Sequence, residues 1–169
     1  MSSRLLLLFS VALAGCSGWS LGPPARALPL AGGDVPAAQA RICVLRSSAE
    51  AGGVTFPVRD NGVLVGATRG GTRFCYLAEP GEHHVVTEAD SSETQSIIVE
   101  AGRSYYLQQE IDAVMGAVKC HTHWVEADQA LQLAAQSEEQ VLVGVPTSEK
   151  LPGQPAFAPS HPATAVGSN

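Results

Sequence analysis

The sequence predicts a small, mainly β protein: an antiparallel β-sandwich of the immunoglobulin or prealbumin type, with one helix near its C-terminal end. Three observations predict this fold. Eight short runs rich in Val, Ile, Tyr, Phe and Thr lie between residues 41 and 125 of the 169-residue chain. Turn residues separate these runs at spacings of roughly eight to twelve positions. Helical propensity begins only after the last run.

The predicted strands are short, and two turn-forming features define how they connect. In chain order the runs are RICVLR, VTFPVRD, VLVGAT, TRFCYLAE, HHVVTEA, TQSIIVE, SYYLQQEI and AVKCHTHWV. Asn61-Gly62 separates the second run from the third, and this dipeptide favours the positive φ angles of a type I′ hairpin. Pro57 has no backbone N–H to donate, so we expect its strand at a sheet edge or at a bulge.

The segment EADQALQLAAQSEE, residues 126–139, predicts the helix. Ala127, Ala130, Leu131 and Ala134 lie at positions i, i+3, i+4 and i+7 of this segment. They form a narrow apolar stripe, which is the pattern of a helix that covers a sheet.

Residues 1–15 have the features of a bacterial lipoprotein signal peptide. Arg4 precedes an apolar run from Leu5 to Leu13, and the run ends in the lipobox LAGC, at residues 13–16. A membrane-spanning helix needs about 20 apolar residues, so this run is too short to be one. We therefore expect cleavage before Cys16 and acylation of that residue. An ordinary signal peptide that happens to contain a cysteine is the alternative.

Several acyl chains on Cys16 would anchor the protein stably, because each buried methylene contributes about 0.8 kcal/mol. The membrane lipid is thus the first predicted partner, and the predicted location is the bacterial cell envelope. Ser17 stands where lipoproteins retained in the inner membrane have Asp. This favours the outer membrane, with the domain facing the periplasm.

Composition divides the rest of the chain into three parts. Residues 16–38 are rich in Gly, Pro and small residues and predict a flexible tether, residues 39–146 form the sandwich domain, and residues 147–169 predict a disordered Pro-rich tail. Cleavage removes Arg4 from the ten Lys and Arg residues, which leaves nine against 16 Asp and Glu. A chain this acidic is not expected to bind nucleic acid.

Three segments carry a resemblance to a known family: RDNGVLVG, FCYLAEPGEHHV and EAGRSYYLQQE. With them the chain resembles the bacterial lipoprotein family catalogued as domain of unknown function 2846, over roughly residues 40–133. The turn PGEHHV also resembles that of the PEGA repeats, which are small β-sandwiches. The resemblance implies an envelope β-domain and carries no catalytic residue. Tyr105 and Tyr106 match its pattern, and alternation along a strand places one ring toward the core and the other on the outer face.

Three cysteines remain once Cys16 is acylated: Cys43, Cys75 and Cys120. An odd number in an oxidising compartment predicts one disulfide and one free thiol. We pair Cys43 with Cys75, because both lie in the middle of predicted strands. Pairings of Cys120 and reduced, buried thiols remain open.

Histidines are the weak candidates for a metal site. His121 and His123 lie on one face of a predicted strand, Cys120 lies on the other, and His83 or His84 could add a third ligand if their strand were a neighbour. Solvent-facing histidines are the simpler interpretation. We therefore expect no metal and no cofactor.

The sequence contains no catalytic motif of the common hydrolases, neither GxSxG nor Ser-x-x-Lys. Glu79, Glu82 and Glu88 surround a turn and could serve a glycosidase, although acidic residues are common in turns. We do not expect an enzyme. The predicted function is a non-enzymatic binding or structural module, whose sheet edges meet an envelope protein or a glycan. A periplasmic metal-binding protein and a small envelope hydrolase are the alternatives.

Overall fold

The structure is a computed structural model that describes residues 18–25, 28, 30, 35–114 and 117–152. Within these ranges it contains one helix, α1 (Ala127–Ala134), and a set of strands. The strands are β1 (Ser20–Gly22), β2 (Ala40–Arg46), β3 (Phe56–Asp60), β4 (Val63–Thr68), β5 (Thr72–Ala78), β6 (Gly81–Thr87), β7 (Glu93–Val99), β8 (Ser104–Val114), β9 (Ala117–Val125), β10 (Glu138–Glu139) and β11 (Val141–Gly144).

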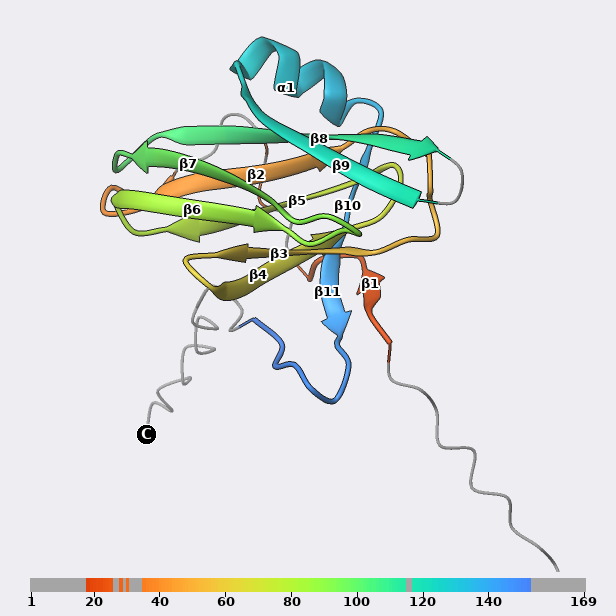
Figure 1. The fold of residues 1–169 in the computed structure, drawn as a ribbon. Coiled ribbons are helices and arrows are strands. Elements are labelled where there is room, and N and C mark those ends of the chain that lie inside the picture. Colours follow the sequence, from red (N-terminus) through yellow and green to blue (C-terminus); the bar gives the residue numbers. More distant parts are fainter. Residues whose placement is uncertain (1–17, 26–27, 29, 31–34, 115–116, 153–169) are drawn as a thin grey trace, which may run out of the picture.

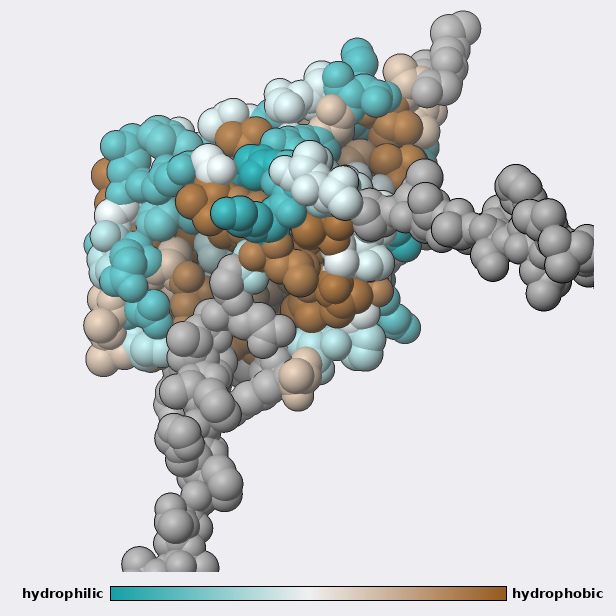
Figure 2. Space-filling model, turned by 90° about the horizontal axis from the view of Figure 1, so that it is seen from below, coloured by the Kyte–Doolittle hydropathy of each residue, from teal (hydrophilic) through white to brown (hydrophobic). Residues whose placement is uncertain are grey.

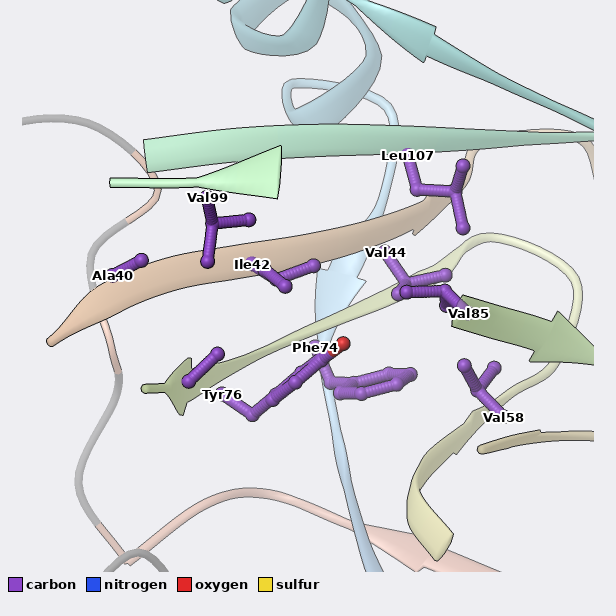
Figure 3. Packing of buried hydrophobic residues seen from close by; sticks show 10 residues of the cluster. Ala40, Ile42, Val44, Val58, Phe74, Tyr76, Val85, Val99 and Leu107 are labelled. Atoms are coloured by element: carbon purple, nitrogen blue, oxygen red, sulfur yellow. The ribbon is translucent and has the colours of Figure 1, made fainter. Parts of the chain in front are cut away.

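Two sheets form the predicted sandwich (Figure 1). One sheet has the strand order β10-β5-β2-β8-β9, the other has the order β4-β3-β6-β7, and β1 pairs separately with β11. The main core lies between the two sheets, and Figure 3 shows its side chains pointing toward one another. Its buried members are Ala40, Ile42, Val44, Val58, Phe74, Tyr76, Ala78, Val85, Val99 and Leu107.

The strand pairing is mixed, whereas the sequence predicted a wholly antiparallel sandwich. β2 runs antiparallel to β5 but parallel to β8, and β10 runs parallel to β5. Between β5 and β8 the chain crosses to the other sheet and forms β6 and β7 there. The chain therefore returns beside β2 as β8, which runs in the same direction as β2. Residue patterns within single strands do not reveal this parallel pairing.

Helix α1 covers the outer face of the five-stranded sheet (Figure 1). Of the predicted stripe, Ala130 and Ala134 pack toward the sheet, whereas Ala127 and Leu131 are exposed and Leu133 packs in their place. Beneath the helix Ala130 packs with Cys43, Leu45, Cys75 and Tyr106 in a second core. The helix is shorter than predicted: it ends at Ala134, and Glu138–Glu139 pair with β5 instead. The guanidinium of Arg73 donates to the carbonyl oxygens of Ala134 and Ser137, which satisfies carbonyl groups where the helix stops.

Part of the predicted tether belongs to the fold. Ser20–Gly22 form β1, which pairs with β11, and Trp19 packs against Leu64, Ala67 and Leu142. Leu30 is buried in the second core, and its carbonyl oxygen accepts a hydrogen bond from Tyr106. The prediction was wrong here because isolated apolar residues can pack against an existing sheet without any period of their own.

The start of the predicted disordered tail is also ordered against the domain. A side-chain oxygen of Glu149 lies 2.6 Å from the guanidinium of Arg59 in β3. The signal peptide with Cys16, and residues 153–169 of the tail, lie outside the described residues. No helix in the described ranges is long and apolar enough to cross a membrane.

The Asn61-Gly62 dipeptide and Pro57 are the two features from which the sequence predicted how the strands connect. Asn61 and Gly62 have φ angles of 48° and 81°, so both are positive, as a type I′ turn requires. Pro57 lies in an interior strand, since β3 pairs with both β4 and β6. Pro57 itself pairs with Ala67 of β4, and the pairing of β3 with β6 begins one residue later, at Val58. The register shift follows between Val58 and Arg59 and leaves Val65 of β4 without a partner in that ladder, so Pro57 is neither on an edge strand nor at the shift.

Candidate functional site

A buried polar cluster joins β3, β5 and β6 at one end of the sandwich. The Asp60 carboxylate oxygen Oδ2 lies 2.7 Å from Nδ1 of His83 and accepts a hydrogen bond of 3.0 Å from the hydroxyl of Tyr76. All three residues are buried. Burial raises the pKa of Tyr76 well above its usual range, and the Asp60 carboxylate raises it further, so this hydroxyl remains a donor. His83 is therefore not the solvent-facing histidine that the sequence suggested.

The hydrogen bonds of His83 decide what the cluster can do chemically. Its second nitrogen, Nε2, lies 2.8 Å from the carbonyl oxygen of Glu79. A carbonyl oxygen can only accept, so Nε2 carries a proton and has no free lone pair. Both ring nitrogens of His83 are therefore engaged, Nδ1 with Asp60 and Nε2 with the carbonyl oxygen of Glu79. The Asp60–His83 pair is thus a structural clamp, although a carboxylate beside an imidazole resembles part of a catalytic triad.

Of the three acidic candidates, Glu88 lies at the opposite end of β6 from Glu79 and Glu82. Glu79 and Glu82 are exposed next to the start of β6, whereas Glu88 follows its end. Six residue steps along a strand separate Glu82 from Glu88 by about 20 Å. The Glu88 carboxylate also lies 2.7 Å from the Arg59 guanidinium. Two glycosidase carboxylates lie about 5–10 Å apart, so Glu82 and Glu88 do not form such a pair.

The two histidines of β9, exposed His121 and half-buried His123, each lie near a carboxylate on the neighbouring strand β8. Nε2 of His121 lies 3.5 Å from Asp112, and Nε2 of His123 lies 3.9 Å from Glu110. These are two separate pairs. Among the residues that the structure describes, no group of three or more His, Cys, Asp or Glu residues is placed to hold a metal ion.

The third metal ligand proposed from the sequence is not beside this pair. His83 and His84 lie on β6, in the opposite sheet from β9. His83 is buried in the Asp60 clamp, and His84 is exposed with its Nδ1 2.8 Å from the hydroxyl of Ser96. The predicted strand face of His121 and His123 is correct, but the strands that would complete the site are not neighbours.

Cys43 and Cys75, the tentative pair, are joined by a disulfide in the structure. They face each other directly across the antiparallel strands β2 and β5, beneath α1. The bridge closes a loop with a sequence separation of 32 residues, for which chain-entropy arguments give about 3–4 kcal/mol of stabilisation.

Cys120 is the free cysteine among the described residues, and it is buried. Burial raises the pKa of its thiol to about 12, and Glu93 raises it as well, while nearby Arg46 acts in the opposite direction. A thiol with so high a pKa is protonated at neutral pH and is a poor nucleophile.

The sheet edges remain as candidate interaction sites, and most of them are covered. On β9, Glu93 accepts a hydrogen bond from the Thr122 N–H, Gln95 donates to the Thr122 carbonyl oxygen, and Asp90 accepts from the Val118 N–H. On the other side of the sandwich, β11 and Trp19 lie against β4. β10 is only two residues long. Side chains and short strands thus protect these edges from pairing.

The seven-residue strand β7 ends its sheet, and β6 is the only strand bonded to it in the described part of the chain. The direction of its main-chain groups follows from His84, which lies opposite Ser96. The N–H and carbonyl groups of His84 are both bonded to Asn61, on the β3 side. His84 and Ser96 are therefore a non-hydrogen-bonded pair, and the main-chain groups of Ser96 point away from β6.

Alternation along the strand extends this result to Thr94 and Ile98. These two residues and Ser96 present a row of donors and acceptors toward the free edge of β7. Their side chains are exposed, and Ile98 is 73% exposed. We call this row the β7 edge. The sequence indicated that the sandwich has edges, but not which edge stays open, because the order of strands depends on contacts between distant residues.

Within the described ranges β7 is thus the long strand that ends its sheet, bonded to β6 alone, while its side chains Glu93 and Gln95 reach the neighbouring edge strand β9 of the other sheet. Comparison of the chain with protein-family models, with curated proteins and with solved structures gives no match.

Proposed function

We propose that the protein is a lipid-anchored lipoprotein of the bacterial envelope, whose sandwich is a non-enzymatic binding module. Acylated Cys16 holds it to the membrane, and the β7 edge receives an extended segment of another envelope protein. The one-sided pairing of β7, which is bonded to β6 alone among the described strands, is the observation that carries the binding function.

The lipobox supports the anchoring part of the proposal. The apolar run of residues 5–13 ends in LAGC, residues 13–16, and β1 of the folded domain begins at Ser20, only four residues after Cys16. The disulfide between Cys43 and Cys75 is in keeping with an oxidising compartment outside the cytoplasm.

The geometry of the β7 edge favours a protein partner over a glycan. A strand that adds to a sheet is recognised by main-chain hydrogen bonds, and the outward groups of Thr94, Ser96 and Ile98 have the strand spacing to provide them. Sugar-binding surfaces, in contrast, usually present exposed aromatic rings. The well-exposed large apolar residues of the described chain are all aliphatic: Val54, Val63, Ile98, Leu131, Val143 and Leu151.

A proline at Ser96 tests this function in the intact envelope. Ser96→Pro removes the outward N–H without removing a donor to β6, because that N–H faces the free edge. Ser96→Ala is the matched control, since it changes the side chain but keeps the N–H. A photocrosslinking amino acid at Thr94 then reports what lies against β7 in each background.

We expect one discrete envelope protein to be crosslinked at Thr94 in the unmodified and Ser96→Ala proteins, and its yield to fall at least several-fold in Ser96→Pro. Circular dichroism and thermal unfolding of both variants verify that the fold is kept. Equal crosslinking in the two variants, or no discrete product in any of them, would show that β7 is not the binding edge.

A further inference from the structure

Exposed apolar side chains gather on the side of the molecule that carries β1, β11 and the hairpin of β3 and β4. Figure 2 looks at this side and shows the apolar atoms grouped there. Three well-exposed residues belong to it: Val63 is 65% exposed, Val143 53% and Leu151 49%. We call this side the underside.

The elements of the underside are placed by contacts with β4. Leu142 of β11 is buried against Leu64, and Trp19 packs in the same cluster. Val143 follows Leu142 along the strand, so its side chain points the other way, toward solvent. Val63 and Leu151 line one shallow groove between β4 and the C-terminal part of the described chain.

The chain enters the domain at this side. Ser20, the first residue of β1, pairs with Gly144, the last residue of β11, and Figure 1 shows β11 running away from the sandwich toward this end. Only three residues separate Cys16 from Ser20. A fully extended chain covers at most about 3.5 Å per residue, so the Cα atom of Ser20 lies within about 14 Å of that of Cys16.

That distance determines which face can meet the membrane. Helix α1 lies on the opposite side of the sandwich from β1 and β11 (Figure 1). Two packed sheets are about 10 Å apart and a helix layer adds about as much, so the far face is more than 14 Å from the underside. An acylated Cys16 would therefore hold the underside, and not the helix, next to the bilayer.

The charged groups around the underside are compatible with a lipid surface. Arg59 is paired with Glu88 and Glu149, and Arg69 donates to the carbonyl oxygen of Trp19 and to the hydroxyl of Thr55. Side chains that satisfy each other in this way lose less on approaching the headgroups than unpaired charges would. Trp19 itself is a residue type that is enriched at membrane interfaces.

We propose that the underside lies against the bilayer that holds acylated Cys16, with Val63, Val143 and Leu151 in contact with the headgroup region. This inference rests on the lipid anchor of the proposed function and adds an orientation to it. The β7 edge belongs to another side of the molecule and stays accessible to a partner.

The test uses an environment-sensitive nitrobenzoxadiazole dye on single introduced cysteines. Val63→Cys and Val143→Cys report on the underside, and Ile98→Cys on β7 and Leu131→Cys on α1 are exposed controls on other faces. The acylated Cys16 has no free thiol and Cys120 is buried, so the dye attaches at the chosen site. The lipidated proteins are reconstituted into liposomes of phosphatidylethanolamine and phosphatidylglycerol and treated with dithionite, which reduces dye exposed to water.

We expect dithionite to reduce the dye at residues 63 and 143 several-fold more slowly than at residues 98 and 131. This protection should disappear in the soluble Cys16→Ser protein. Equal rates at all four sites in a protein that floats with the liposomes would overturn the contact and leave the anchor intact. A purified native protein that carries no lipid and does not float would overturn the anchor itself. Protection at 63 and 143 without liposomes would mean that protein, and not lipid, covers the underside.

Discussion

Asp60 is the residue on which the buried clamp between β3, β5 and β6 depends. Its carboxylate is the common partner of His83 and Tyr76, so one side chain satisfies two buried polar groups from two other strands. In the dry interior such groups stabilise the fold only when they are paired, since an unpaired one retains the full cost of its desolvation.

We predict that Asp60→Ala lowers the free energy of unfolding by about 1–3 kcal/mol, because it leaves the His83 and Tyr76 donors buried without an acceptor. Urea unfolding followed by fluorescence measures the change. Glu82→Ala, which removes an exposed carboxylate near the same turn, is the control and should change stability little. Equal effects of the two variants would contradict a structural role for the cluster.

Cys120 makes the stability of the protein depend on alkaline pH. Burial raises the pKa of the folded thiol from its ordinary 9.0 to about 12. Between these values the folded thiol keeps a proton that the unfolded thiol loses, so the folded state binds more protons. The free energy of unfolding must then fall as the pH rises above about 9.

Comparison with Cys120→Ala isolates this effect, since Tyr76 adds its own alkaline dependence in both proteins. Urea unfolding at about pH 8 and about pH 10.5 should show a smaller loss of stability in the variant than in the unmodified protein. Equal losses of stability in the variant and the unmodified protein would contradict the burial of the Cys120 thiol in the structure.

The sequence allowed a prediction of the disulfide but not of which histidine on β6 is buried. Cys43 and Cys75 could be paired because two mid-strand cysteines can face each other, and the structure contains that bridge. His83 could not be distinguished from His84, because adjacent strand residues point to opposite faces. Which of them points inward depends on the register between β6 and its neighbours.

At the scale of elements, the closeness of the two sheets at Gly66 is the clearest packing constraint. An ideal Cβ on Gly66 of β4 would lie 2.4 Å from the ring atom Cε2 of Phe74 on β5. Because Phe74 is buried in the main core, its ring has little room to move. Glycine at this position lets a strand of one sheet lie directly against an aromatic ring of the other.

We therefore predict that Gly66→Ala lowers the free energy of unfolding by about 1–3 kcal/mol through steric overlap. Combining it with Phe74→Leu, which shortens the clashing side chain, should cost less than the sum of the two single changes. Gly53→Ala is the matched control, because a Cβ there meets no atom within 4 Å. Thermal and urea unfolding of the two single variants, the double variant and Gly53→Ala measure these changes in stability. Strictly additive losses from Gly66→Ala and Phe74→Leu would contradict the close contact between the two residues.

The strands were predictable as elements because each has its own apolar or β-branched pattern. The boundaries of α1 and the existence of β1 and β10 were not. Glu138–Glu139 look helical in sequence but pair with Thr72 and Arg73, and Ser20–Gly22 form a strand only because β11 is beside them. These short elements depend on tertiary contacts, which override weak local propensity.

At the scale of the whole molecule, strand order decides the function that we propose. β7 ends its sheet and is bonded to β6 alone among the described strands, its side chains reach β9 of the other sheet, and the ribbon of β1 and β11 lies beside β4 at the opposite edge. None of these relations lies within one segment of the sequence. The lipobox, in contrast, is a local motif, and so the anchor could be predicted from the sequence alone.

The anchor also links the two proposed surfaces. An acyl group on Cys16 would place the underside at the bilayer, because so few residues precede β1, and the β7 edge would face away from it toward a partner. Without the anchor, neither the orientation of the underside nor the choice of an envelope partner has a basis.

The most direct measurement is therefore the intact mass of the protein purified from its own envelope, together with flotation of the unmodified and Cys16→Ser forms. We predict a mature chain that begins at Cys16 with the added mass of its acyl chains and that floats with membranes, and a Cys16→Ser form that is released or remains uncleaved. A mature chain that begins elsewhere or carries no lipid, or a Cys16→Ser protein processed and retained like the unmodified one, would contradict this account.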